Sequence, residues 1–350
     1  GFNRQFISSF QTFGSTLVQF QRTGGDFGGP PSEDERLRRV LTLEDARAIA
    51  RRAWAIEQVS PERWRLGGPD VRGPRERMTD ADVGGVTHTY PLANAHFTER
   101  GRFFTEGEER HDTPVAIIGP SLAETLFPNL DPLGRTIHVE GRPFTVIGVF
   151  EEKGSFLGGS ADDQVVIPIG VFDRIWPDLM RTHGCVIATV PRRPEWLNLA
   201  VEQGTQILRE RRGIRFGEPN DFEILTPERL IRIFRQVTGG VSAAMLAIAG
   251  ISLVIGGVGV MNIMLMNVTQ RTREIGIRKA LGARRRDILQ QFLTEAVTLA
   301  LAGGVAGVAA GLGIAYLLGA LSPFPANPSV GAVVSGLGVA MLVGLFFGTY

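Results

Sequence analysis

Two long runs of the chain contain no charged side chain, one over residues 236–270 and the other over residues 296–350. About 20 apolar helical residues are enough to cross a bilayer, so the first run predicts a transmembrane helix at about 239–268. Three prolines within 321–328 interrupt the second run, because a helix cannot continue through them. That run predicts two transmembrane helices, at about 289–319 and 330–350. Core helices of a soluble protein would instead need a polar face.

The loop charges predict the orientation of these helices. Residues 271–287 contain seven basic and two acidic side chains, whereas the hairpin at 320–330 contains none. By the positive-inside rule the basic loop lies in the cytoplasm. Residues 1 to about 236 are then expected outside the cytoplasm. Since no membrane helix precedes them in this sequence, we expect the sequence to be truncated.

The charged two-thirds of the chain predicts a large α+β domain over 14–225. Both of its ends show the same order of strand, helix and extended segment. These elements are expected at 17–21, 42–53 and 56–60, and again at 185–190, 194–211 and 222–225. We expect the two ends to form one subdomain, interrupted by a β-rich insertion at about 85–180.

Two helical segments are expected to connect this domain to the membrane. Phenylalanines at helical spacing predict a stalk helix over 1–13, and residues 226–240 predict a second one. The second stalk leads into the membrane domain at 239–350. The fold class is therefore a membrane protein with three visible transmembrane helices and a large extracytoplasmic α+β domain on a helical stalk.

Composition excludes several classes of function. The 37 basic and 36 acidic residues nearly cancel, so nucleic acid is not an expected partner. The single cysteine, Cys185, excludes a disulfide framework and a Cys-rich zinc module, and is expected to be a small core residue in an apolar strand. No catalytic or metal-binding set is predicted.

A few polar residues could suggest chemistry but have simpler interpretations. His88, His96 and His111 lack metal-ligand spacing and are expected to be surface or core residues. Asp162 and Asp163 could bind a cation, yet a solvated turn is the expected role.

The basic loop has an ordered composition that points to a partner. Glu274 precedes Arg278 by four residues, which favours a helical ion pair. Gly282 is placed to end this short helix, and Ala283 to start another. Ile275, Ile277 and Leu281 are expected to form an apolar strip. The loop is either a topology signal at lipid headgroups or, as the mixture of residues favours, a docking element for a protein.

Residues 271–283, followed by residues 288–296, resemble the permease signature of MacB/FtsX-type ABC transporters. Upstream segments are similar in order and spacing to the MacB-like periplasmic core domain. These segments are Gly-Arg-Phe-Phe at 101–104, Val-Ala-Ile-Ile-Gly at 115–119, Leu-Phe at 126–127, Asp-Pro-Leu-Gly at 131–134 and Phe-Thr-Val-Ile-Gly-Val at 144–149. The resemblance covers most of the chain from about residue 101 onward.

The resemblance implies a four-helix permease of the bacterial inner membrane that acts as a dimer, with a second copy or a related permease, on two cytoplasmic ATPase subunits. It implies a coupling helix to the ATPase, with motion relayed through the stalk in a process called mechanotransmission. The matching coupling residues are Arg271, Arg273, Glu274, Ile275, Gly276, Ile277, Arg278, Lys279, Ala280, Leu281 and Gly282. The first family helix, the basic tail after the last helix and a fused nucleotide-binding domain are absent from this sequence.

Three functions are compatible with this family. The MacB branch works with a periplasmic adaptor and an outer-membrane channel to expel antibiotics, peptides or other substrates, and the segment at 101–150 favours this branch. FtsX-like proteins instead regulate a cell-wall hydrolase without transport, and related permeases release lipoproteins.

The sequence itself contains no site for ATP chemistry. A phosphate loop requires Gly-Lys-Ser/Thr, but the only lysines are Lys153, after Glu152, and Lys279, after Arg278. We therefore expect a non-catalytic permease subunit with no cofactor of its own. ATP and Mg²⁺ would be bound by a partner ATPase, or by a portion outside this sequence.

Two features of the transmembrane helix expected at about 289–319 suggest specific packing. Gly303, Gly307 and Gly311 form a ridge at i, i+4 and i+8, which permits close helix packing. Glu295 is costly to expose to lipid, so it is expected to face the cytoplasmic interface or to pair with Arg271 or Arg273.

Topology provides the first test. In a Cys185→Ser background, single cysteines at positions 142 and 325 should react with a membrane-impermeant thiol reagent added outside intact cells. A cysteine at position 284 should react only after the membrane is permeabilised, because the positive-inside rule places it in the cytoplasm. Labelling of position 284 from outside would reverse the topology.

Overall fold

The computed structural model describes residues 17–24, 32–156, 159–160, 162–321 and 330–349. It divides into two compact units between Ile233 and Phe234. We call them the α/β unit and the helical unit, and each is described by itself. The stalk helix expected over 1–13 and the prolines of the 320–330 hairpin lie outside the described residues.

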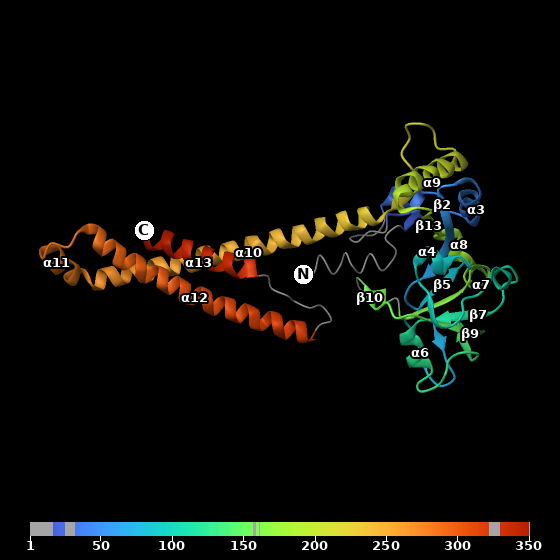
Figure 1. Ribbon diagram of the computed structural model, residues 1–350, viewed down its shortest axis with the longest axis horizontal. Coiled ribbons are helices and arrows are strands. Elements are labelled where there is room, and N and C mark those ends of the chain that lie inside the picture. Colours follow the sequence, from blue (N-terminus) through green and yellow to red (C-terminus); the bar gives the residue numbers. More distant parts are fainter. Residues whose placement is uncertain (1–16, 25–31, 157–158, 161, 322–329, 350) are drawn as a thin grey trace. The chain divides into compact units, whose positions relative to one another are not determined.

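The first half of the α/β unit is built from both of its ends. Four antiparallel strands lie in the order β14 (Glu223–Leu225), β1 (Val18–Gln21), β13 (Val186–Pro191) and β2 (Ile56–Arg65). Helices α3 (Leu43–Arg52) and α9 (Leu197–Arg212) cover this sheet and enclose Phe20, Leu208 and Phe222 (Figure 1). Strands from both ends of the unit thus pair in one sheet.

Local sequence explains why the two helices begin and end as they do. Thr42 and Asp45 form a reciprocal capping box at the start of α3, which satisfies backbone N–H groups that the first turn leaves free. Gly213 ends α9 with φ +69°, a left-handed conformation that glycine adopts without steric cost.

The second half of the α/β unit continues the sheet through residues between these ends. From β2 the order is β5, β12, β7, β9, β8, β3 and β4, with β6 also paired to β9. The bounds are β3 (Val71–Arg72), β4 (Arg77–Met78), β5 (Asp82–Val86), β6 (Thr98–Gly101), β7 (Val115–Ile118), β8 (Thr136–Val139), β9 (Arg142–Phe150) and β12 (Gln164–Pro168). Every residue of β7 and β12 is buried, because apolar clusters cover both faces of the sheet here.

Short helices and one small ribbon complete this unit. They are α2 (Glu33–Leu37), α4 (Tyr90–Asn94), α5 (Glu106–Arg110), α6 (Pro120–Leu126), α7 (Ile169–Ile175), α8 (Pro177–Thr182), the 3-10 turn η1 (Pro194–Trp196), and the β10 (Ser155–Phe156) and β11 (Gly159–Ser160) pair.

Strand β2 joins the two halves by changing its partner midway. Glu62 is the last residue opposite β13, and Arg63 is the first opposite β5. Arg63 donates from Nε to the Gly184 carbonyl at 3.1 Å and forms an ion pair with Asp173. Glu62 is buried, with no cationic side chain of the described residues within 4.0 Å of its carboxylate, and accepts from Asn94 Nδ2 at 2.5 Å and Trp64 Nε1 at 3.3 Å. Burial raises the pKa of Glu62 to about 7.

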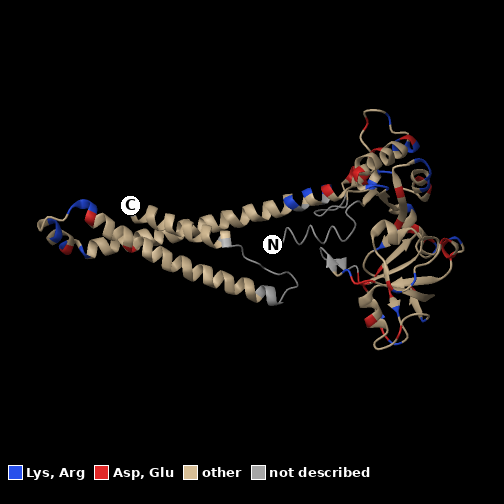
Figure 2. Ribbon diagram, viewed as in Figure 1, with Lys and Arg blue, Asp and Glu red and all other residues tan. Residues whose placement is uncertain are grey.

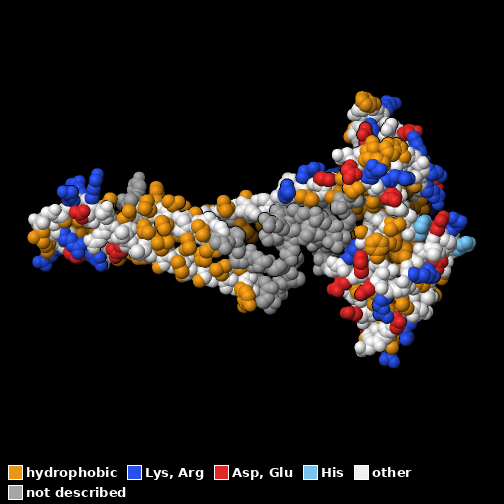
Figure 3. Space-filling model, in the orientation of Figure 1, with side chains coloured by type: hydrophobic (Ala, Val, Ile, Leu, Met, Phe, Trp, Pro, Cys, Tyr) orange, Lys and Arg blue, Asp and Glu red, His pale blue; other side chains and the backbone are white. Residues whose placement is uncertain are grey.

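The helical unit contains long apolar helices. α10 (Pro227–Gln270), which begins in the α/β unit, and α12 (Arg285–Leu321) are long and apolar enough to cross a membrane, and α13 (Val330–Thr349) contains a shorter apolar helix, Val333–Gly348. The apolar windows of α10 and α12 are only 6% and 0% buried, so they are not the core helices of a soluble fold. Figure 3 shows apolar side chains spread over this surface. These helices fit a membrane permease, with the third expected span the shortest.

Small residues set the closest contacts among the helices. A Cβ added to Gly344 would lie 2.6 Å from the Ala300 Cβ, and one added to Gly257 would lie 2.3 Å from the Phe347 ring. The expected ridge of Gly303, Gly307 and Gly311 has no described atom within 4 Å of an added Cβ. Its packing role therefore stays a prediction.

Glu62 gives the α/β unit a testable pH dependence. Its pKa is about 7 when folded against 4.5 ordinarily, so the folded state binds more protons between these values and stability falls as pH rises through that window. The effect is at most about 3 kcal/mol. Glu62→Gln should therefore unfold at a higher temperature than wild type at pH 8 and near the wild-type temperature at pH 4.5.

Tryptophan fluorescence of the full chain reports this unfolding, because all four tryptophans lie in the α/β unit. Glu57→Gln, an exposed position on the same strand, is the matched control and should show no such pH-dependent difference. A Glu62→Gln curve that parallels wild type across the whole pH range would contradict the buried, uncompensated carboxylate.

Candidate functional site

The cytoplasm-facing loop predicted from the sequence forms a helical elbow. α10 ends at Gln270, α11 (Thr272–Ala280) follows after one residue, and α12 begins at Arg285. Gly282 has φ +94°, which ends the short helix as expected. The next helix starts two residues later than the expected Ala283, because Asp287 Oδ2 accepts from the Arg284 N–H at 3.1 Å and caps the helix there.

Polar contacts tie both ends of α11 to one face of α12. Arg278 donates to Glu274 Oε1 at 2.7 Å and to Gln291 Oε1 at 2.5 Å. Arg271 Nη1 lies 3.9 Å from Glu295 Oε2. Gln291 and Glu295 are one helical turn apart, so they face the same way. The predicted pair of Glu274 with Arg278 is confirmed, and of the alternatives expected for Glu295 the structure shows the pair with Arg271.

Gln291 is a site residue that sequence reasoning missed. It carries no charge, and its partner lies 13 residues away across the bend at Gly282. The one available signal was its position four residues before Glu295, on the same helical face.

The elbow exposes an apolar pair surrounded by positive charge. Ile277 is 54% exposed and Leu281 is 83% exposed, and their spacing of four places them on one side. Ile275 is half-buried, so the expected three-residue strip is wrong at that position. Residues two apart on a helix point in nearly opposite directions. Basic side chains gather around this end of the helical unit, whereas the helices beyond it are almost without charge (Figure 2).

This arrangement suits recognition of a protein surface. An exposed apolar pair supplies contact area, and the surrounding basic residues would orient an acidic partner surface. Among the residues that the structure describes, no group of three or more His, Cys, Asp or Glu side chains could hold a metal ion. With its exposed apolar pair and surrounding basic side chains, the elbow is suited to docking against a protein.

The other polar residues singled out in the sequence lie in the α/β unit. His96 is buried and stacks on Phe150 at 3.9 Å, and burial lowers its pKa to about 3, so it is a neutral core residue. His88 and His111 are exposed. Cys185 is buried one residue before β13, where burial raises its pKa to about 12. The expected core and surface roles are confirmed.

The solvated turn expected at Asp162 is wrong. Asp162 is 6% exposed and accepts from the backbone N–H groups of Lys153 and Gly154 at 2.9 and 2.8 Å. A buried carboxylate needs such donors, and the backbone at 153–154, eight to nine residues earlier, supplies them. Asp163 is half-buried.

Comparison with known families matches most of the chain. Residues 1–205 match the model of the MacB-like periplasmic core domain, and residues 246–350 match that of the FtsX-like permease C-terminal domain.

Curated relatives align over essentially the whole chain. The macrolide export ATP-binding/permease protein MacB of Bdellovibrio bacteriovorus is 31% identical over 356 residues, which cover 100% of this chain and 53% of that protein. The pyoverdine export ATP-binding/permease protein PvdT of Pseudomonas aeruginosa is 35% identical over 350 residues, which cover 99% of this chain and 50% of that protein. The chain thus spans about half the length of these relatives.

A solved structure shares the fold of the α/β unit. The periplasmic region of MacB from Actinobacillus actinomycetemcomitans superposes with a TM-score of 0.52 at 19% sequence identity, covering 66% of this chain and 98% of that one. At this identity the likeness concerns the fold.

The contact between α11 and α12 predicts a measurable effect of Gln291. Gln291→Ala removes one acceptor of Arg278, and a hydrogen bond of this kind contributes about 0.5 to 1 kcal/mol. Amide hydrogen exchange over 272–280 in the membrane-embedded chain should therefore accelerate about two- to fivefold. Gln290→Ala, at the adjacent exposed position, is the control and should exchange like wild type. Equal exchange rates in Gln291→Ala and wild type would show that the Arg278–Gln291 hydrogen bond does not stabilise α11.

Proposed function

This chain belongs to the family of ABC transporter permeases with a MacB-like periplasmic core domain and an FtsX-like permease domain, and we propose that it converts the nucleotide cycle of a cytoplasmic ATPase into movement of its periplasmic domain. The observation that carries this proposal is the elbow at residues 271–282. It is a short exposed helix between two long apolar helices, and polar side chains at its two ends contact α12.

In this proposal Ile277 and Leu281 insert into the ATPase surface. The basic residues Arg271, Arg273, Arg278 and Lys279 orient this docking contact. The hydrogen bond to Gln291 and the ion pair with Glu295 make α11 and α12 move together. α10 is a single helix from Pro227 to Gln270, and its first residue follows β14 after one intervening residue. A displacement of the elbow would therefore act on α10, the helix that directly follows strand β14 of the α/β unit. This continuity supports mechanotransmission.

We further propose that the chain serves export from the bacterial inner membrane, with its α/β unit in the periplasm. The named relatives are export proteins for macrolides and pyoverdine, and they align over the full chain. ATP and Mg²⁺ would be bound by the ATPase, either as a separate subunit or in a portion outside this sequence. The other proposed partners are a second permease copy and, in the periplasm, an adaptor and an outer-membrane channel.

Reversal of one charge on the elbow tests the coupling. Glu274→Lys should leave insertion and folding intact, because an exposed pair contributes only about 0.3 to 0.5 kcal/mol. Co-purification with the cognate ATPase, and stimulation of its turnover, should fall at least about tenfold, because a lysine at this position repels Arg278, four residues away, and misdirects the docking side chains. Glu124→Lys, at an exposed position of α6 in the α/β unit, is the matched control.

A charge swap separates docking from helix stability. Glu274→Lys combined with Arg278→Glu restores an opposite-charge pair within α11. If Glu274→Lys acted only by destabilising that helix, the swap would restore the complex. Docking predicts that the swap stays defective, because Arg278 is lost both as a docking charge and as the partner of Gln291. Full complex formation and full stimulation in Glu274→Lys would overturn the proposal.

A further inference from the structure

Five arginines surround one cavity in the first half of the α/β unit. The cavity has a volume of about 590 Å³ and lies between the segment after α2 and the end of α8. Its basic lining residues are Arg22, Arg36, Arg38, Arg39 and Arg181. Like charges gathered in this way repel one another unless an anion lies among them.

Carboxylates compensate only part of this charge. Arg38 lies 3.8 Å from Glu35 and 3.1 Å from Glu223, and Glu223 also binds Arg229 at 2.6 Å. Within the described part of the chain, no carboxylate oxygen lies within 4.0 Å of the guanidinium of Arg39 or of Arg181; both residues are exposed. Two guanidinium groups at this cavity are thus available to an external anion.

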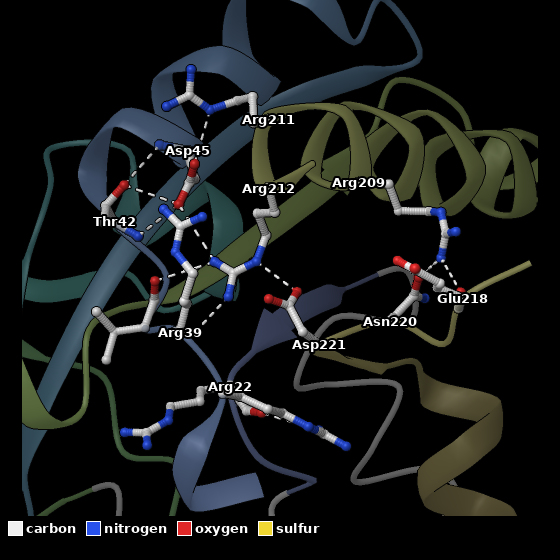
Figure 4. A network of polar contacts seen from close by, with 12 residues as sticks. Arg22, Arg39, Thr42, Asp45, Arg209, Arg211, Arg212, Glu218, Asn220 and Asp221 are labelled. Carbon is white, nitrogen blue, oxygen red and sulfur yellow. Dashed lines mark hydrogen bonds and ion pairs between the residues drawn. The ribbon is translucent and has the colours of Figure 1, made fainter. Parts of the chain in front are cut away.

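The backbone that carries these arginines is held in place by other arginines. Arg22 donates to the carbonyls of Arg36 and Thr182, on the two sides of the cavity. Arg212, whose side chain is 1% exposed, donates to the carbonyls of Arg39 and Val40 at 2.6 and 3.2 Å. Figure 4 shows Arg212 between Arg39 and Asp221, with which it forms an ion pair of 2.6 Å. The segment is therefore ordered before any ligand arrives, which lowers the entropic cost of binding.

We propose that this arginine pocket binds a phosphate group, either as a free anion or as the headgroup of an anionic phospholipid. The guanidinium fork matches phosphate oxygens, and a phosphate offers more acceptor positions to several arginines than a single carboxylate does. Leu37, 79% exposed between Arg36 and Arg38, places an apolar side chain beside the pocket, as a lipid surface would favour. This inference is independent of the coupling role of the elbow.

Calorimetric titration of the full chain in phosphatidylcholine nanodiscs tests the pocket, with inorganic phosphate and pyrophosphate as probes. Wild type should show saturable binding that weakens as salt is added. The double variant Arg39→Gln/Arg181→Gln should bind at least about tenfold more weakly, because two charged donors are lost. The double variant Arg77→Gln/Arg142→Gln removes two exposed arginines elsewhere in the same unit, and it should bind like wild type.

Nanodiscs that contain phosphatidylglycerol distinguish the source of the phosphate. If the headgroup occupies the pocket, pyrophosphate affinity should fall in these discs for wild type but not for Arg39→Gln/Arg181→Gln. An unchanged affinity would assign the pocket to a free anion. Absence of saturable binding in phosphatidylcholine discs, or equal binding by both double variants, would overturn the proposal. Neither result would bear on ATPase stimulation, which reports the elbow.

Discussion

A bilayer interior accepts apolar side chains and rejects charge, and this constraint organises the entire chain. It explains why no charged residue occurs over 236–270 or 296–350. The described parts of the resulting helices bury few side chains, and their close contacts involve glycine and alanine. Charge is therefore concentrated where the chain leaves the membrane. The elbow is the densest such place in the helical unit, and this is why a recognition surface can form there.

The α/β unit obeys a different constraint, since two half-sheets must share one strand. β2 pairs with β13 along its first part and with β5 along its last part. Glu62 and Arg63, the residues at which β2 changes its partner, are buried polar groups. A buried carboxylate without a cation is destabilising when charged. Its hydrogen bonds come from Trp64 on the same strand and from Asn94 at the end of α4.

Sequence patterns predicted a structural feature correctly wherever the residues that determine it are close together in the chain. The capping box of Thr42 and Asp45, the ion pair of Glu274 and Arg278, and the helix end at Gly282 all depend on residues within four positions. Periodicity likewise predicted the strands at both ends of the α/β unit. Prediction failed where the partner lies beyond the reach of a local pattern. Asp162 accepts from backbone N–H groups eight to nine residues away, and Gln291 contacts Arg278 across the bend at Gly282. Ile275 is different, since helical geometry alone could have placed it apart from Ile277.

The bonds from α11 to α12 have a consequence for how such permeases can diversify. The proposed recognition surface belongs to α11, but its direction is specified by Gln291 and Glu295 on the following helix. The elbow is therefore not a portable module. A chimera that received residues 271–282 from another permease would carry the side chains that recognise that permease's partner. It would lack the two α12 residues that orient them in the donor protein. Partner choice and membrane packing in this chain must consequently change together, and the boundary of the exchangeable unit lies within α12.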